Sequence, residues 1–291
     1  MDSVKKILSG FIYVTLIVLL AGFSWADGCK AKYGNNDLTF RLATGSPGEL
    51  GLLKELANAF NARHHSSMCW IKAGSGKSLK LLKAKKVDIV MVHAPAAEKK
   101  AIAEGWAIKR TLIGSNEFYI VGPKDDPAGI AHAKTASEAY AKIAKAKANF
   151  LSRGDNSGTN KKELAIWKKS GIKPQADSSS NWYIITKDFM MATLKKADHI
   201  KGYFMTDSST WVAGKKDLKN LKILFRGDPV LINTYHGLCQ PVNGDKKQVI
   251  ASQFIDFLSS DKAQRILRDY GKNFYGEGMY NDAEYAKQYD H

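Results

Sequence analysis

The feature that most constrains this chain is a regular alternation of strand-like and helix-like segments that begins near residue 38. Apolar runs predict strands at 38–43, 69–73 and 87–92, and apolar residues at helical spacing predict helices over 50–60 and 79–84. A β-α-β-α-β run of this kind builds a mostly parallel sheet with helices on both faces. Ligands of such sheets bind outside the carboxyl ends of the strands. We therefore expect an α/β fold with its site at the turns that follow the strands.

A second α/β unit follows a strand expected at 118–122, where Pro123 and Pro127 mark a turn. The pattern predicts a helix at 135–148, a strand at 150–152, a helix at 159–170, a Ser-rich loop at 177–181, strands near Tyr203 and Leu224, a buried strand at 230–233, and helices at 249–258 and 261–270. Two strand-like connections, 118–122 and 230–235, would join two lobes. We predict a cleft between the lobes that closes over a ligand by hinge motion.

Residues 1–26 have the pattern of a secretory signal peptide. Lys5 and Lys6 precede an uncharged apolar run over 7–23, and Ser24, Trp25 and Ala26 follow it. The run is at the lower length limit of a membrane-spanning helix, so an uncleaved anchor is the alternative. We predict export and a periplasmic location.

The charge balance favours anionic partners. The chain of 291 residues carries 44 Lys and Arg against 28 Asp and Glu, a formal net charge of +16, and its 44% apolar content excludes a disordered chain. Only 7 of the basic residues are Arg. Base reading and bidentate phosphate contacts favour Arg over Lys, so we expect no nucleic-acid partner.

Three cysteines remain after the predicted signal peptide: Cys29, Cys69 and Cys239. Their spacing matches no zinc pattern, and export implies an oxidising compartment, so one disulfide and one free thiol are expected. We predict that Cys29 pairs with Cys69, because both lie at the edge of the first two predicted strands. Cys239 lies in an apolar stretch and is expected to be a buried thiol.

The turn after the first strand contains Thr44, Gly45, Ser46 and Pro47. Ser46 fits the N-cap of a helix and Pro47 its first position. Free backbone N–H groups and the Thr44 and Ser46 hydroxyls would then converge where an anion could bind. The alternative is an ordinary helix cap with no ligand.

The turn after the second strand contains Gly74, Ser75, Gly76 and Lys77. A phosphate-binding P-loop requires a Gly where this chain has Ile71, so nucleotide binding is not expected. A Gly-Ser-Gly turn still lets the backbone approach a small anion closely. Lys77 faces either this ligand or solvent.

The segment 151–159 combines Arg153, Asp155, Ser157, Gly158 and Thr159 between a short strand and a helix. A guanidinium with nearby hydroxyl and N–H donors suits a tetrahedral oxyanion. Asp155 would orient Arg153, since a carboxylate facing a dianion would repel it. The alternative is that Arg153 and Asp155 pair in a surface turn.

Enzyme and metal constellations are weak. The seven His residues lack zinc-site spacing, and no Gly-x-Ser-x-Gly motif is present. His93 follows a buried strand and could reach the cleft, although packing in a turn is the alternative. We predict that the protein is not an enzyme and has no metal or cofactor.

Several segments resemble the tungstate-binding proteins of bacterial ABC importers, which are type II periplasmic binding proteins with two α/β lobes. The resemblance covers nearly the whole chain after the signal peptide and lies in residues 38–73, 92–98, 121–130, 152–164, 192–194, 206–211 and 225–229. It implies binding of an oxyanion in the cleft between the lobes.

Two departures bear on the ligand. That family opens its first turn with a Thr-Thr-Thr-Ser stretch, whereas this chain reads Thr44-Gly45-Ser46-Pro47. The family also has Gly residues around a Met where this chain has Phe189, Met190 and Met191, which would narrow or reshape the cleft. Binding therefore transfers more directly than tungstate as the ligand.

The sequence thus predicts a monomeric solute-binding protein that captures tungstate or molybdate and delivers it to an ABC permease in the inner membrane. Lobe 1 would comprise 27–117 and 236–291, and lobe 2 would comprise 118–235. The absence of a committed acceptor for the proton of phosphate favours a fully deprotonated anion. The alternative is a sensing or accessory domain for sulfate, phosphate or an organic acid, and a polyanion binder is the weakest hypothesis.

Overall fold

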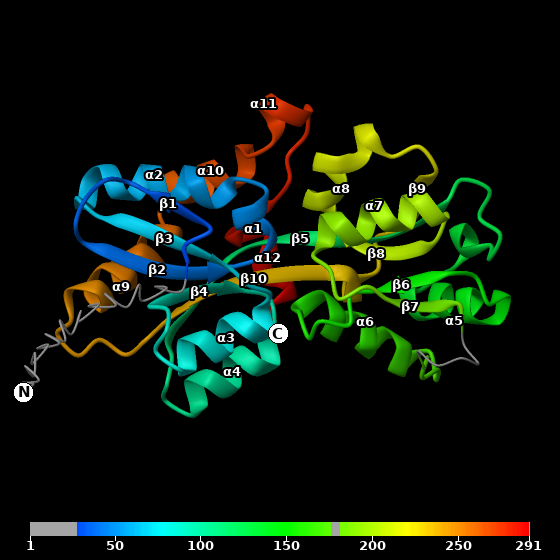
Figure 1. Ribbon diagram of the computed structural model, residues 1–291, viewed down its shortest axis with the longest axis horizontal. Coiled ribbons are helices and arrows are strands. Elements are labelled where there is room, and N and C mark those ends of the chain that lie inside the picture. The colour runs from blue at the N-terminus through cyan, green and yellow to red at the C-terminus, as the bar shows by residue number, and fades with distance from the viewer. Residues whose placement is uncertain (1–27, 176–180, 291) are drawn as a thin grey trace, which may run out of the picture.

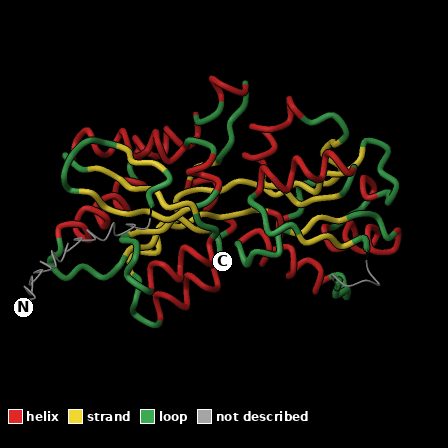
Figure 2. The backbone as a smooth tube through the Cα atoms, in the orientation of Figure 1, coloured by secondary structure: helices red, strands yellow, loops and turns green. Residues whose placement is uncertain are grey.

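The computed structural model describes residues 28–175 and 181–290, and its backbone forms two lobes side by side (Figures 1 and 2). The predicted signal peptide and most of the predicted Ser-rich loop lie outside the described residues. Within the described residues, no helix is both long enough and apolar enough to span a bilayer.

The first lobe is a sheet with helices on both faces. Its strands are β1 (Ala31–Tyr33), β2 (Thr39–Thr44), β3 (Ser67–Lys72) and β4 (Ile89–Val92), and its helices are α1 (Ser46–Glu49), α2 (Leu52–His64), α3 (Ser75–Lys83), α4 (Pro95–Ala103), α9 (Lys246–Leu258), α10 (Asp261–Asp269) and α11 (Lys272–Tyr275). Strands β3, β2 and β4 are parallel neighbours. Their carboxyl ends therefore meet at one edge, as the alternating pattern predicts.

The second lobe repeats this design with shorter strands. It contains β6 (Phe150–Ser152), β7 (Tyr183–Ile185), β8 (Tyr203–Asp207) and β9 (Leu221–Phe225), the helices α5 (Ala136–Ala146), α6 (Gly158–Lys169), α7 (Met190–Ile200) and α8 (Ser208–Gly214), and the 3-10 turns η1 (Ile130–His132), η2 (Lys215–Asp217) and η3 (Pro229–Leu231). β7, β6 and β8 are parallel neighbours in that order.

Two long strands connect the lobes. β5 (Ile108–Pro123) pairs with β10 (Ile232–Cys239) over its first part and with β8 and β9 over its second part. In Figure 1 both strands run through the middle of the molecule. β10 returns to lie between β4 and β5, so the chain crosses between the lobes twice.

The final segment packs back onto this crossing. β11 (Asn281–Asp282) pairs with β5 at Ser115 and Gly114, and α12 (Ala283–Ala286) and η4 (Lys287–Tyr289) follow it. The crossing thus gains a short third strand, hydrogen-bonded to β5 within the same sheet.

Each lobe has its own apolar core. In the first lobe, one cluster lies under α2, α9 and α10 and includes Phe40, Phe60 and Phe254, and a smaller cluster under α3 and α4 includes Val90. The second lobe is filled by rings such as Tyr140, which is fully buried. Separate cores let each lobe hold its shape while the connecting strands bend.

A network of charges anchors β10 to its surroundings. His236 lies with Nδ1 3.0 Å from Glu98 Oε2 and Nε2 3.1 Å from Asp290 Oδ1. Arg110 on β5 bridges the same two carboxylates, with Nε 3.1 Å from Glu98 and Nη2 2.8 Å from Asp290. Both His236 and Glu98 have fully buried side chains. A buried carboxylate such as that of Glu98 is tolerated only when it has a partner, and the Arg110 guanidinium supplies one.

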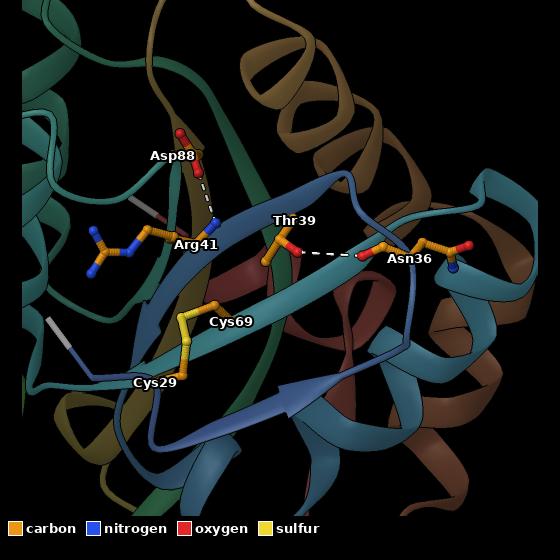
Figure 3. Close-up of a disulfide and its surroundings, with 6 residues drawn as sticks. All are labelled: Cys29, Asn36, Thr39, Arg41, Cys69 and Asp88. Carbon is orange, nitrogen blue, oxygen red and sulfur yellow. Dashed lines mark hydrogen bonds between the residues drawn. A yellow bond between two sulfur atoms is a disulfide. The ribbon is translucent and has the colours of Figure 1, made fainter. Parts of the chain in front are cut away.

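The predicted disulfide is confirmed. Cys29 and Cys69 are bonded, with their Cα atoms 5.3 Å apart, and the bond links the start of the described chain to β3 (Figure 3). Beside it, the Asp88 carboxylate accepts a 2.7 Å hydrogen bond from the Arg41 amide. Cys239 is the buried free thiol that the sequence predicts, and burial raises the pKa of this thiol to about 11.

Two local predictions are wrong. Ser46 is not an N-cap: Gly45 holds that position and α1 begins at Ser46. The helix expected over 50–60 does not begin at Leu50, because Gly51 has a φ of +92° that interrupts the chain before α2.

Candidate functional site

The second and third predicted turns meet face to face between the lobes. A Cβ added to Gly74 would lie 3.1 Å from the Ser157 Cβ, and one added to Gly76 would lie 2.5 Å from the Asn156 carbonyl oxygen. The turn before α3 thus touches the turn before α6 at backbone distance. The two lobes are in a closed arrangement here, and glycine at 76 is required for it.

Each of these turns ends in a helix N-terminus. Ser157 caps α6 by accepting a 3.3 Å hydrogen bond from the Asn160 amide, and its own amide donates to Asp155 Oδ1 at 3.1 Å. Gly158 and Thr159 open α6, just as Ser75 and Gly76 open α3. Amides in the first turn of a helix have no partner within the helix and carry the positive end of its dipole. Two positive helix ends therefore face each other where the lobes meet, and this contact zone between the lobes is called the cleft below.

Arg153 is buried beside these helix ends, with 4% of its surface exposed. Its Nη2 donates to Asp155 Oδ2 at 2.5 Å, and its Nε donates to the Asp188 carbonyl oxygen at 3.1 Å. A guanidinium has five N–H donors, so these two bonds leave three without an acceptor among residues 28–175 and 181–290. Arg153 and Asp155 do pair: Asp155 lies in an exposed bend over 154–156, as the alternative expects, but the Arg153 side chain is buried beneath it.

The first turn contributes little free hydrogen-bonding capacity. Thr44 is buried and its Oγ1 donates to the Met91 carbonyl oxygen at 2.9 Å. Ser46 Oγ donates to Asp207 Oδ2 at 3.4 Å, which is a contact between the lobes. Since a hydroxyl has one proton, both side chains already use the donor that an anion would need.

A hydrogen-bonded chain connects this turn to the crossing strands. Asn233 on β10 donates to Asn116 on β5 at 2.8 Å, and Asn116 donates to the Ser209 hydroxyl at 3.0 Å. Ser209 donates in turn to Asp207, the acceptor for Ser46. Displacement of the crossing strands is therefore coupled to the first turn by direct contacts.

His93 lies at the base of the cleft, between the second and third turns. Its amide donates to Ser75 Oγ at 3.2 Å, and a Cβ added to Gly158 would lie 2.4 Å from His93 Nδ1. Its ring lies beside the Asn233 side chain, and the ring centroid lies 5.0 Å from that of Tyr235. Burial, with the Arg153 charge as the next cause, lowers the pKa of His93 to about 3. The imidazole is thus neutral at physiological pH.

Two polar atoms in this region lack a partner. Among the described residues, neither Thr159 Oγ1 nor His93 Nδ1 has one, although both atoms are screened from solvent. A buried polar atom without a partner is uncommon, because it loses its hydrogen bonds to water without replacement. Both atoms lie beside the start of α6, where a polar ligand would satisfy them.

Lys77 is the one predicted site residue that the structure separates from the others. It is exposed and lines an outer cavity of about 420 Å³ together with basic neighbours that include Lys30 and Lys86. The other ten predicted site residues lie in or beside the three turns where the lobes meet: Thr44, Gly45, Ser46, Ser75, Gly76, His93, Arg153, Ser157, Gly158 and Thr159. In the described residues, no three His, Cys, Asp or Glu side chains gather as metal ligands would.

Sequence reasoning gave no role in the cleft to Asp207 and Lys72, and it named Phe189 only as a residue that would narrow or reshape the cleft. Asp207 ends β8 and caps α8, which is the pattern of strand end and helix start that marks the other turns. Lys72 at the end of β3 and Phe189 before α7 meet across the cleft, with Lys72 Nζ 4.1 Å from the ring centroid. The Asp207 signal is present in the sequence, whereas the contact between Lys72 and Phe189 depends on how the lobes sit.

Comparisons with known proteins agree with this architecture. A model of the PBP superfamily domain matches residues 31–262. The tungstate-binding protein TupA of Peptoclostridium acidaminophilum is 35% identical over 291 residues, covering 95% of this chain and 98% of its own. The chain belongs to this family of periplasmic binding proteins.

Two further relatives support the assignment. TupA of Campylobacter jejuni, also a tungstate-binding protein, is 33% identical over 229 residues, which cover 76% of this chain and 82% of its own. The solved structure of the tungstate ABC transporter from Geobacter sulfurreducens has a TM-score of 0.72 and 37% identity, covering 81% of this chain and all of its own. The fold is that of a type II periplasmic binding protein.

Proposed function

We propose that this protein is the solute-binding component of an ABC importer and that it captures a tetrahedral oxyanion between its lobes, tungstate or molybdate before others. The observation that carries the proposal is the meeting of the α3 and α6 helix ends beside the buried Arg153, which retains unused donors. The relatives named tungstate-binding proteins support the choice of ligand.

In this proposal the anion lies against the first turns of α3 and α6. Arg153 provides the charge, the amides of Ser75, Gly76, Gly158 and Thr159 provide donors, and the Thr159 hydroxyl and His93 ring line the base. Thr44, Gly45 and Ser46 form a wall whose hydroxyls face other partners. Binding requires no bond to be made or broken, so the protein acts without catalysis.

Selectivity follows from the supply of donors. Arg153 and the helix-end amides only donate, and in this proposal the neutral His93 presents a protonated Nδ1 to the anion, whereas phosphate at neutral pH carries a proton that needs an acceptor. The carboxylate of Asp207 already accepts from Ser46, Ser209 and Thr210. We therefore place tungstate, molybdate and sulfate above phosphate as ligands.

The setting belongs to the same proposal. Residues 1–26 would direct export to the periplasm as a signal peptide, and an ABC permease in the inner membrane would receive the anion from the monomer. Residues 27–117 with 236–291 would move as one lobe and residues 118–235 as the other, with β5 and β10 bending between them.

The test is a thermal-shift and calorimetric panel on the desalted protein with tungstate, molybdate, sulfate, phosphate and a set of organic acids. At a hundredfold excess over Kd, a ligand that binds only the folded state stabilises it by about 2.7 kcal/mol. A shift with tungstate or molybdate is the expected result. If no tetrahedral anion shifts the transition, the proposal is wrong, and a shift confined to organic acids assigns a different solute class.

A further inference from the structure

Phe189 is an aromatic side chain that both lobes hold. It precedes α7 in the second lobe and is half-buried. Its ring centroid lies 4.1 Å from the Lys72 ammonium of the first lobe and 5.5 Å from the Arg153 guanidinium carbon of the second. Cations within about 6 Å of an aromatic ring are attracted by its quadrupole. The ring therefore contacts the proposed anion-binding cation and a cation of the opposite lobe.

Each partner is fixed within its own lobe. The Phe189 carbonyl oxygen accepts hydrogen bonds from the Thr193 amide at 2.9 Å and the Thr193 hydroxyl at 3.1 Å. The preceding carbonyl, that of Asp188, accepts from Arg153 Nε. Phe189 therefore moves with Arg153 when the lobes separate.

Lys72 has a comparable anchor in the first lobe. Its Nζ lies 2.9 Å from Glu49 Oε1, and Glu49 belongs to the short helix that begins at Ser46. The ammonium is thus positioned before the lobes close. Of the contacts that Phe189 makes with the two cations, only the one to Lys72 joins the lobes, so it is the one that opening breaks.

We propose that Phe189 is a gate residue of the oxyanion site and that Lys72 latches it in the closed state. This inference rests on the proposed function. The ring covers the side of the site next to Arg153, and the ammonium docks on it only after closure. The pair then sets how long a captured anion stays rather than how fast it enters, since affinity differences within one interface lie mostly in the dissociation rate.

The experiment measures tungstate release. Protein loaded with tungstate is mixed with excess molybdate, and the tungsten that remains bound is determined by elemental analysis after rapid desalting at successive times. Phe189→Ala removes the ring and its bulk, Phe189→Leu keeps bulk without a π face, and Lys72→Met removes the cation but keeps the stem. We expect release to be about tenfold faster for Phe189→Ala and about threefold faster for each of the other two variants.

A double variant isolates the latch. If the ring and the ammonium act on each other, Phe189→Leu combined with Lys72→Met releases tungstate no faster than either single variant. The matched control is Lys83→Met, because Lys83 Nζ lies 5.4 Å from the Trp106 ring centroid, outside the cleft. That variant removes an equal charge and a similar contact, and its release rate should equal that of the wild type.

The possible outcomes distinguish failure of the gate proposal from failure of the proposed function. Wild-type protein that binds no tetrahedral oxyanion removes the proposed function and the gate with it. Wild-type protein that binds tungstate, with all three cleft variants releasing it at the wild-type rate, overturns the gate and leaves the function standing. Additive effects of the two single changes would also overturn the latch, because they show that Lys72 and Phe189 act independently.

Discussion

The first lobe presents hydroxyl groups that are already engaged, whereas the second lobe presents a buried guanidinium with unused donors and a hydroxyl with no partner. Thr44 donates to Met91 and Ser46 donates to Asp207, but three N–H groups of Arg153 and the Thr159 hydroxyl lack acceptors in the described chain. In the proposed site, the second lobe would therefore supply the charge and most side-chain donors, and the first lobe would supply the amides of α3 and a close-fitting backbone surface. An anion should bind the second lobe first and be enclosed by the first.

Arg153→Ala gives the largest expected effect, because it removes the positive charge that the second lobe contributes to the proposed site. Loss of one member of a buried, hydrogen-bonded charge pair typically costs 2–5 kcal/mol, so we expect tungstate Kd to rise about 100-fold or more by calorimetry. Arg63 is exposed, and Arg63→Ala is a control that changes the net charge equally. Equal, small effects of the two variants would contradict the assignment of charge to Arg153.

Gly76→Ala changes only the shape of the surface that the first lobe presents to the second, and it tests whether that close fit is needed for binding. The added Cβ would meet the Asn156 carbonyl at 2.5 Å and keep the lobes from closing, so we expect tungstate Kd to rise about tenfold or more. Gly74→Ala should have a weaker effect, since its new contact is the Ser157 Cβ at 3.1 Å. Because Gly76 has helical backbone geometry in the first turn of α3, alanine there should not destabilise the protein with its lobes open. Weaker binding together with a lower melting temperature would indicate damage to the fold instead.

Much of this arrangement was predictable, because parallel strands bring their carboxyl ends to one edge. The turns at Gly74 and Arg153 were identified from short strands followed by helix-start residues, and α4 could have been found from Pro95 at its start. The contact of Ser46 with Asp207 spans 161 residues, and no local pattern encodes it. The N-cap was misplaced by one residue because Ser46 has the preferred side chain, while Gly45 adopts the backbone geometry that the turn requires.

A matched pair of Thr→Val substitutions compares one hydroxyl of each lobe directly. Thr159→Val removes an unpartnered hydroxyl, so the free protein should keep its stability while tungstate Kd rises about three- to tenfold. Thr44→Val removes the hydrogen bond to Met91 and should lower the free energy of unfolding by about 1 kcal/mol with little change in Kd. Urea denaturation measures the free energy of unfolding of both variants, and calorimetry measures their tungstate Kd. The reverse pattern would mean that the first lobe's hydroxyl, and not the second lobe's, contacts the anion.

Acid titration gives the smallest expected effect, and it concerns His93, which lies where the two lobes meet. Burial, then the Arg153 charge, lowers the pKa of His93 to about 3, whereas a histidine in an unfolded chain titrates near 6.5. The unfolded state binds more protons below pH 6.5, so stability falls as the pH falls from 6.5 toward 3. The unfolded histidine is only about half-protonated at pH 6.5, so the full shift corresponds to about 1 kcal/mol between pH 6.5 and 5.5, and the partial exposure of the side chain makes this an upper limit for the loss. His93→Gln should reduce this loss in urea titrations, and an unchanged slope would assign it to other groups.

The anchoring of β10 on both sides leaves a very short flexible pivot. Lys162 holds the carbonyl oxygens of Val230 and Ile232 at 2.8 and 2.9 Å from one lobe, while Glu98 and Asp290 hold His236 from the other. If the lobes open, we expect torsion in this strand to concentrate in residues 233–235, next to the register shift between Tyr235 and His236, so that the lobes rotate about this point rather than slide. Asn233 and Tyr235 within that pivot both contact His93, and each rotation is therefore transmitted to the place where the captured solute would rest.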